Sequence, residues 1–161
     1  MCRRRLCSKC CYDREDIKTL EAIAKQRTAE ARGAETMITN WNPKNKEERE
    51  QAGINDIDII EAVDYYTTSR GQSSNSPNKL NFTSVASVIA FDTFHLAESL
   101  LTQPLQIIVG DVQGAFGSYR DGHELYNKVA SKKKDLFILE GVSHYDLYDK
   151  EEPVRKAIEK L

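Results

Sequence analysis

One histidine of this sequence occupies the position expected of a catalytic base. His144 lies in a short polar segment, 141–146, directly after an apolar run. An earlier polar segment, 110–122, also follows an apolar run and carries Asp111 and Asp121. A carboxylate that binds an imidazole fixes the tautomer of the ring and stabilises the imidazolium that forms when the ring takes a nucleophile's proton. These residue types therefore indicate general-base chemistry.

Two short apolar runs, 105–110 and 136–141, must position these segments, and both are typical of buried strands. Between them, residues 121–132 have apolar side chains at helical spacing. A strand, a helix and a strand in this order predict a right-handed crossover between parallel strands. Ligands of such sheets bind at the carboxyl ends of the strands. We therefore expect His144 and the two aspartates at one edge of the sheet.

The sequence before residue 104 predicts mainly helices, joined by a loop at 70–79 that is rich in Ser, Asn, Gly and Pro. The expected organisation is an irregular Cys- and Arg-rich tail at 1–16, a helical region at 17–103 and a βαβα unit at 104–161. The expected helices of the middle region are 17–32, 46–51, 57–66, 84–90 and 94–101, and the chain is expected to end in a helix over 153–161.

Composition excludes several classes of protein. The 161 residues suit one domain, and with 40% hydrophobic and 30% charged residues the chain is too apolar for a disordered protein and too polar for a membrane protein. The formal net charge of −2 gives no reason to expect nucleic acid or a membrane surface as partner. All four cysteines lie within the first 11 residues, so neither a disulfide framework nor a tetrahedral metal site is expected. We expect a cytoplasmic protein without a cofactor.

Five segments of the sequence carry a family resemblance: QRTAEARGAE at 26–35, EAVDYYTTSRGQ at 61–72, FDTFHLAE at 91–98, GAFGSYRDG at 114–122 and GVSHYDLYD at 141–149. Together they resemble α/β-hydrolases of the group related to dienelactone hydrolases. The resemblance extends over about residues 18–161 and implies a partial α/β-hydrolase fold, in which the helical region corresponds to the lid. It also implies that His144 is the triad base, that Asp111 or Asp121 is the triad acid, with Asp111 slightly favoured, and that the substrate is a small-molecule ester, thioester or lactone.

The nucleophile of that family lies on a Gly-x-Ser-x-Gly turn, or on the same turn with Cys, and no segment of this sequence matches that pattern after a strand. The oxyanion-binding segment is not found either. We therefore expect the C-terminal portion of a hydrolase, with no Ser or Cys of this chain within bonding reach of His144 and with little or no activity alone. Such a chain is expected to self-associate or to complement a separate N-terminal part. The alternative is a non-catalytic protein that binds a partner through an exposed sheet edge.

Overall fold

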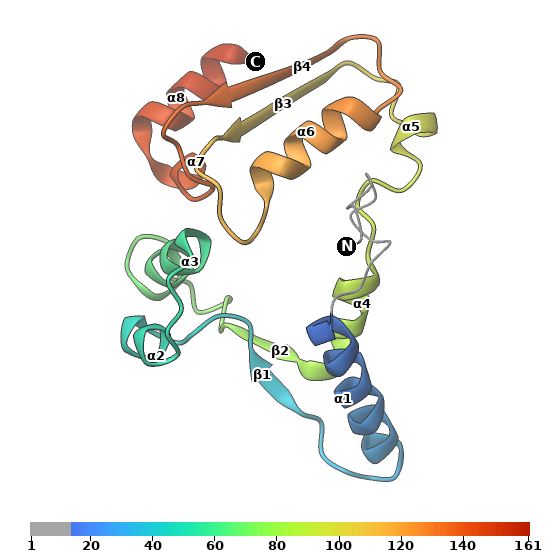
Figure 1. Cartoon of the computed structure of the whole chain (residues 1–161). Coiled ribbons are helices and arrows are strands. Elements are labelled where there is room, and N and C mark those ends of the chain that lie inside the picture. Colours follow the sequence, from blue (N-terminus) through green and yellow to red (C-terminus); the bar gives the residue numbers. More distant parts are fainter. Residues whose placement is uncertain (1–13) are drawn as a thin grey trace. The chain divides into compact units, whose positions relative to one another are not determined.

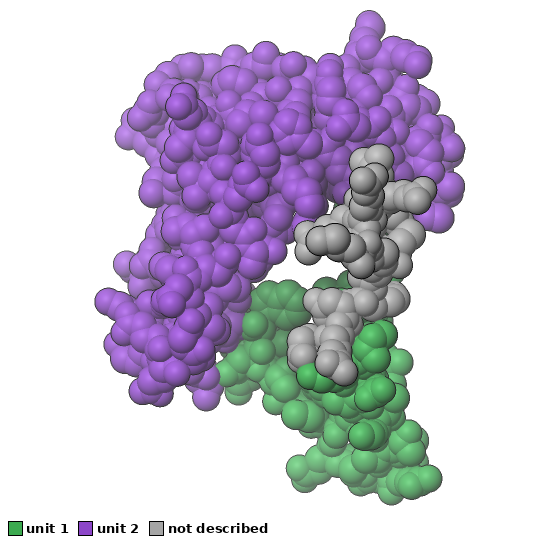
Figure 2. All heavy atoms as spheres, in the orientation of Figure 1, with its two compact units in different colours: residues 1–41, 76–93 green, residues 42–75, 94–161 purple. Residues whose placement is uncertain are grey.

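The computed structural model describes residues 14–161, so the four cysteines and nearly all of the expected tail lie outside the described residues. The chain forms two compact units, which Figure 2 shows in two colours. Of the described residues, unit 1 contains 14–41 and 76–93, and unit 2 contains 42–75 and 94–161. The division between the units therefore does not fall at residue 103, because segment 42–75 belongs with the C-terminal part of the chain.

Unit 1 joins a long helix to a small antiparallel sheet (Figure 1). Its elements are α1 (Arg14–Ala31), β1 (Ile38–Asn40), β2 (Lys79–Asn81), the 3₁₀ turn η1 (Phe82–Ser84) and α4 (Val85–Ala90). The side chain of Ile23 is the best-buried apolar group of α1, and α1 contacts both η1 and α4. The guanidinium of Arg27 donates a hydrogen bond of 3.0 Å to the carbonyl oxygen of Thr83, which links α1 to η1.

Unit 2 is built around two parallel strands. Its elements are α2 (Lys46–Gln51), α3 (Ile57–Thr67), α5 (Ala97–Leu100), β3 (Leu105–Gly110), α6 (Ser118–Lys128), β4 (Lys134–Leu139), α7 (Asp146–Asp149) and α8 (Glu151–Lys160). β3 and β4 pair in parallel from Leu105 opposite Lys134 to Gly110 opposite Leu139. The helix α6 connects the strands, as the sequence predicted (Figure 1).

The two faces of this sheet are covered by different helices. On one face, the buried side chains of Ile107 and Val109 lie against α6, where Gly122 allows a close approach. On the other face, Lys160 of α8 pairs with Asp135 of β4 at 2.9 Å and lies over the ring of Phe137. The sheet is therefore covered on both faces, and the loops that follow β3 and β4 begin at the carboxyl ends of its strands.

Three expectations about the elements are wrong. The second parallel strand, expected at 136–141, is Lys134–Leu139. The region 17–103 contains a two-stranded antiparallel sheet as well as helices, because β1 and β2 are three residues each and pair across about 40 residues, a distance that no local periodicity reveals. The crossover helix begins at Ser118 and not at Asp121, since Gly117 precedes it in a left-handed conformation, with φ of 74°.

The fold is therefore mixed α/β, with helices and two small sheets of which one is parallel. This agrees with a partial α/β fold at a coarse level. Within residues 14–161, no helix combines the length and the apolar character that crossing a bilayer requires. The same residues contain no group of three or more His, Cys, Asp and Glu side chains placed to hold a metal ion.

Candidate functional site

A cavity of about 270 Å³ lies at the carboxyl ends of the parallel strands in unit 2. Its apolar wall includes the side chains of Ile108, Val109, Val112 and Leu147. Its polar side chains are those of Asp58, Ser118, His144 and Tyr148. His144, which the sequence predicts to be a base, therefore lines the edge of the sheet at which open parallel sheets bind their ligands.

Both ring nitrogens of His144 have hydrogen-bond partners from this chain. Nδ1 lies 2.8 Å from the hydroxyl oxygen of Ser118, at the start of α6. Nε2 lies 3.0 Å from the phenol oxygen of Tyr148, on α7. The expectation that no Ser or Cys of this chain lies within bonding reach of His144 is therefore wrong. The sequence search looked only for a nucleophile turn between small residues, and Ser118 occupies the first residue of a helix.

A reciprocal pair of hydrogen bonds fixes the loop that carries His144. The carboxylate of Asp146 accepts from the backbone N–H of Ser143 at 3.1 Å, and the hydroxyl of Ser143 accepts from the N–H of Asp146 at 3.1 Å. This is the pattern of a capping box, in which two polar side chains satisfy each other's backbone donors. Burial raises the pKa of Asp146, but the hydrogen bonds from Lys150 and Ser143 outweigh it and hold the pKa below its ordinary value.

Replacing Asp146 with asparagine is expected to lower the free energy of unfolding by about 1 kcal/mol at neutral pH. Because the pKa of Asp146 is depressed in the folded chain, its contribution is present above the carboxyl's ordinary pKa of 3.8 and is lost as the pH falls through the folded value. Urea unfolding of the two chains at pH 7 and at pH 3 checks this. A difference that stays constant between the two pH values would show that the carboxylate charge contributes nothing.

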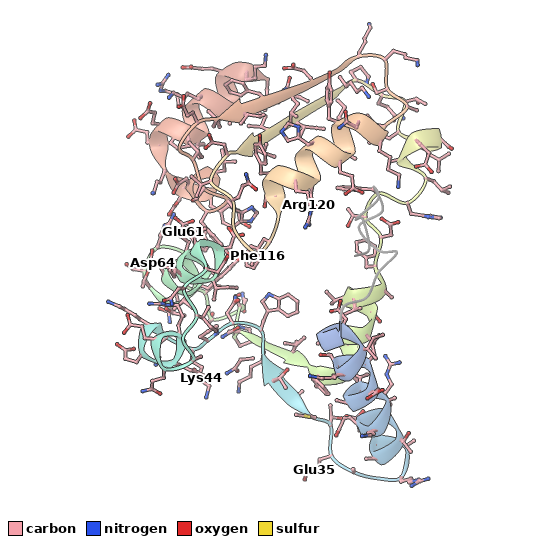
Figure 3. All side chains as sticks on the ribbon, viewed as in Figure 1. Glu35, Lys44, Glu61, Asp64, Phe116 and Arg120 are labelled. Carbon is pink, nitrogen blue, oxygen red and sulfur yellow. The ribbon has the colours of Figure 1, made fainter. Side chains whose placement is uncertain are left out.

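The two candidate partner carboxylates are engaged elsewhere. Asp111 follows β3, as predicted, and its carboxylate accepts a hydrogen bond of 2.7 Å from the backbone N–H of Gly141. It thereby joins the loop after β3 to the loop after β4. Asp121 lies on α6, where its carboxylate pairs with the guanidinium of Arg120 at 2.8 Å. Figure 3 shows Arg120 directed away from the sheet. The role of either aspartate as a triad acid stays a prediction.

Two aspartates at the start of α3 hold the loop that leads into α6. The carboxylate of Asp56 accepts from the backbone N–H of Ala115 at 3.1 Å. The carboxylate of Asp58, of which only 2% of the residue surface is exposed, accepts from the N–H of Phe116 at 2.7 Å. Phe116 lies beside α3 in Figure 3. Sequence reasoning missed both residues, because about 58 residues separate each from its partner.

Aromatic side chains surround the Nε2 side of His144. The ring centroid of Tyr148 lies 5.2 Å from that of His144 and 5.2 Å from that of Tyr65. The ring centroid of Tyr145 also lies 5.2 Å from that of His144. Burial, followed by the neighbouring Tyr66, raises the pKa of both Tyr145 and Tyr148 above that of an ordinary phenol. These phenols therefore remain protonated at neutral pH, and a protonated phenol can donate or accept a hydrogen bond.

Arg70 ties the loop after α3 to α7. Its guanidinium donates two hydrogen bonds of 2.7 Å to the carboxylate of Asp149 and one of 3.2 Å to the carbonyl oxygen of Tyr145. A second carboxylate, that of Asp64, lies 3.2 Å from the guanidinium. The hydrogen bonds from Arg70 hold the pKa of Asp149 below its ordinary value. This forked pairing fixes the turn of α7 that carries Tyr148.

Comparison with known proteins supports the fold and gives no established activity. No family model matches the chain. The uncharacterized protein YcjY of Escherichia coli K12 is 33% identical over 142 residues, which are 88% of this chain and 44% of that protein. The crystal structure of the hypothetical protein PA2218 from Pseudomonas aeruginosa matches 94% of this chain and 45% of that chain, with a TM-score of 0.71 and 22% identity.

The structure of DcsB, solved in complex with its substrate analogue, matches 92% of this chain and 51% of that chain, with a TM-score of 0.67 and 15% identity. At these identities, the likeness to PA2218 and DcsB shows a shared fold and nothing finer. The chain spans about half the length of the proteins that it matches.

Proposed function

We propose that this chain carries the base of an α/β-hydrolase site related to those of dienelactone hydrolases, with His144 as general base. The substrate is a small-molecule ester, thioester or lactone, and the attacking group is supplied from outside these 161 residues. The observation that carries the proposal is the position of His144, which lines a largely apolar cavity at the carboxyl ends of β3 and β4.

In this proposal, Nε2 of His144 removes a proton from the attacking hydroxyl or thiol as its oxygen or sulfur bonds to the carbonyl carbon. The same proton then passes from Nε2 to the leaving alcohol or thiol as the carbonyl re-forms. The hydroxyl of Tyr148 occupies Nε2 at 3.0 Å in this structure, so it must move aside before the ring can accept a proton. Because Tyr148 is 44% exposed, its side chain has space to do so.

Hydrolysis of p-nitrophenyl acetate by the purified chain and by its His144→Ala variant tests the proposal. Water replaces the absent nucleophile in this assay, so the rate of the chain is expected to be low. The His144→Ala change is expected to lower this rate about tenfold, which is less than the rate enhancement that a general base gives in a complete site. His95→Ala is the matched control, because His95 is exposed and does not line the cavity. Equal background rates in the chain and in His144→Ala would contradict the proposal.

A second candidate function is non-catalytic binding of a partner. Within the described residues, β3 pairs only with β4, so its other edge presents backbone groups that a further strand can bind. The partner is a second copy of this chain or a separate N-terminal part. Equal background rates in the hydrolysis assay, together with a self-associated chain in sedimentation equilibrium, would favour this function over catalysis.

A further inference from the structure

The Nδ1 side of His144 is the side on which a triad histidine meets its orienting group. In a Ser-His-Asp triad, a carboxylate accepts the Nδ1–H of the ring, and the opposite nitrogen, Nε2, exchanges the proton of the nucleophile. Here the atom on Nδ1 is the hydroxyl oxygen of Ser118, at 2.8 Å. The position of a charged acceptor is thus taken by a neutral hydroxyl.

The position of Ser118 is set by the loop before it. Gly117 adopts a left-handed conformation, with φ of 74°, and α6 begins at the next residue. Upstream, the buried carboxylate of Asp58 holds the N–H of Phe116 at 2.7 Å, two residues before Ser118. Ser118 is itself half-buried. The conformation of this loop therefore holds the hydroxyl of Ser118 beside the ring of His144.

The contact on the opposite side of the ring is linked to the position of the ring proton. The phenol of Tyr148 contacts Nε2 at 3.0 Å, and burial keeps that phenol protonated by raising its pKa. A phenol O–H that donates to Nε2 requires Nε2 to be the unprotonated, accepting nitrogen. With the phenol as donor, the ring proton is on Nδ1 and points at Ser118, whereas with the phenol as acceptor from Nε2–H, the hydroxyl of Ser118 donates to Nδ1.

We propose that Ser118 is the positioning residue of His144: its hydroxyl oxygen accepts the Nδ1–H of the ring and holds His144 in the tautomer whose unprotonated Nε2 takes a proton once Tyr148 has moved aside. This inference deepens the proposed function and rests on it for its catalytic meaning. Ser118 orients the ring without a negative charge, so it fixes the tautomer and leaves the imidazolium without the stabilisation that a carboxylate supplies.

The tautomer is measured by long-range ¹H–¹⁵N NMR of the ring nitrogens in the full chain, at a pH where His144 is neutral. We expect Nδ1 to give the protonated signature and Nε2 the unprotonated one. Ser118→Ala is expected to shift the ratio of the two tautomers by about fivefold to tenfold toward Nε2–H, which is the size of effect that one ordinary hydrogen bond produces. Ser118→Thr keeps the hydroxyl and is expected to restore the ratio.

Tyr148→Phe supplies an independent variant, since it removes the donor on the other nitrogen and leaves Ser118 in place. It is expected to weaken the preference for Nδ1–H without abolishing it. A chain whose His144 is mainly Nε2–H, or a Ser118→Ala variant with an unchanged tautomer ratio, would overturn the inference. The NMR result does not depend on hydrolysis, so it stands or fails separately from the His144→Ala rate measurement.

A second measurement tests whether Ser118 is instead a nucleophile. A hydroxyl within 2.8 Å of an imidazole is also the arrangement of an activated nucleophile. If Ser118 were that nucleophile, a fluorophosphonate would phosphonylate its oxygen with loss of fluoride, and peptide mass spectrometry would locate the adduct. We expect no adduct on Ser118, and a stoichiometric one that disappears in His144→Ala would overturn the positioning role.

Discussion

Replacing Gly110 with alanine is expected to lower the free energy of unfolding by about 3 kcal/mol. Gly110 is the buried last residue of β3, and a methyl group on its Cα would overlap the carbonyl oxygen of Val142 and lie 2.6 Å from the carbonyl carbon. The obstacle is backbone, and that carbonyl also accepts a hydrogen bond of 3.1 Å from the N–H of Val112. The strand end must therefore separate from the loop that carries His144. Urea unfolding followed by circular dichroism measures the loss.

Gly141→Ala is the matched control for this prediction. Gly141 begins the loop opposite Gly110, and a methyl group there would meet no atom within 4 Å. Its φ of 67° is left-handed, so alanine costs only the backbone term, about 1 kcal/mol. If Gly110→Ala destabilises the chain no more than Gly141→Ala does, the close approach of β3 to the loop after β4 is absent in solution.

The parallel strands and the crossover were predictable from the sequence because their signals are local. Residues 105–110 are an apolar run after Pro104, and β3 has these same bounds. The short helix α2 also has the predicted bounds, since Asn45 caps it through a side-chain bond to the N–H of Glu48. By contrast, β1 and β2 form a ladder of three residues, which is too short to produce an alternating pattern that distinguishes it from a loop.

The position of His144 was predictable, and its partners were only partly so. A polar segment after a buried strand places the histidine at the sheet edge without any knowledge of tertiary contacts. Tyr148 follows it by four residues, and this spacing on a helical turn is a signal that could have identified the contact. Ser118 is 26 residues away, on a helix whose start depends on the conformation of Gly117. No spacing in the sequence encodes that contact.

Contacts within unit 2 position both residues that bind the ring nitrogens of His144, Ser118 and Tyr148. On the Nδ1 side, the start of α3 holds the loop that delivers Ser118, through the acceptor bonds of Asp56 and Asp58. On the Nε2 side, Arg70 fixes α7 through Asp149, and α7 carries Tyr148. The segment expected to act as a lid therefore supports the base from both sides, because it supplies Asp56 at the N-cap of α3, Asp58 in α3 and Arg70 in the loop after α3.

Truncating Asp58 to alanine is expected to lower the free energy of unfolding of unit 2 by about 3 kcal/mol. The change removes the acceptor of the part-buried Phe116 N–H, and it also empties a position that is 2% exposed. The loop before α6 is then released, so the amide hydrogen of Phe116 is expected to exchange with solvent at least tenfold faster at pH 7. Hydrogen exchange followed by NMR, with urea unfolding on the same sample, measures both effects.

Asp58→Asn separates the hydrogen bond from the charge, because the asparagine side-chain carbonyl still accepts from Phe116 while the negative charge is lost. We expect this variant to keep slow exchange at Phe116 and to lose less than half of the stability that Asp58→Ala loses. Since the loop delivers Ser118 to the ring, Asp58→Ala is also expected to shift the tautomer ratio of His144 in the direction of Ser118→Ala, and Asp58→Asn is not. Equal effects of the two variants on exchange and on the tautomer would mean that charge, and not the bond to the loop, is what α3 contributes to the site.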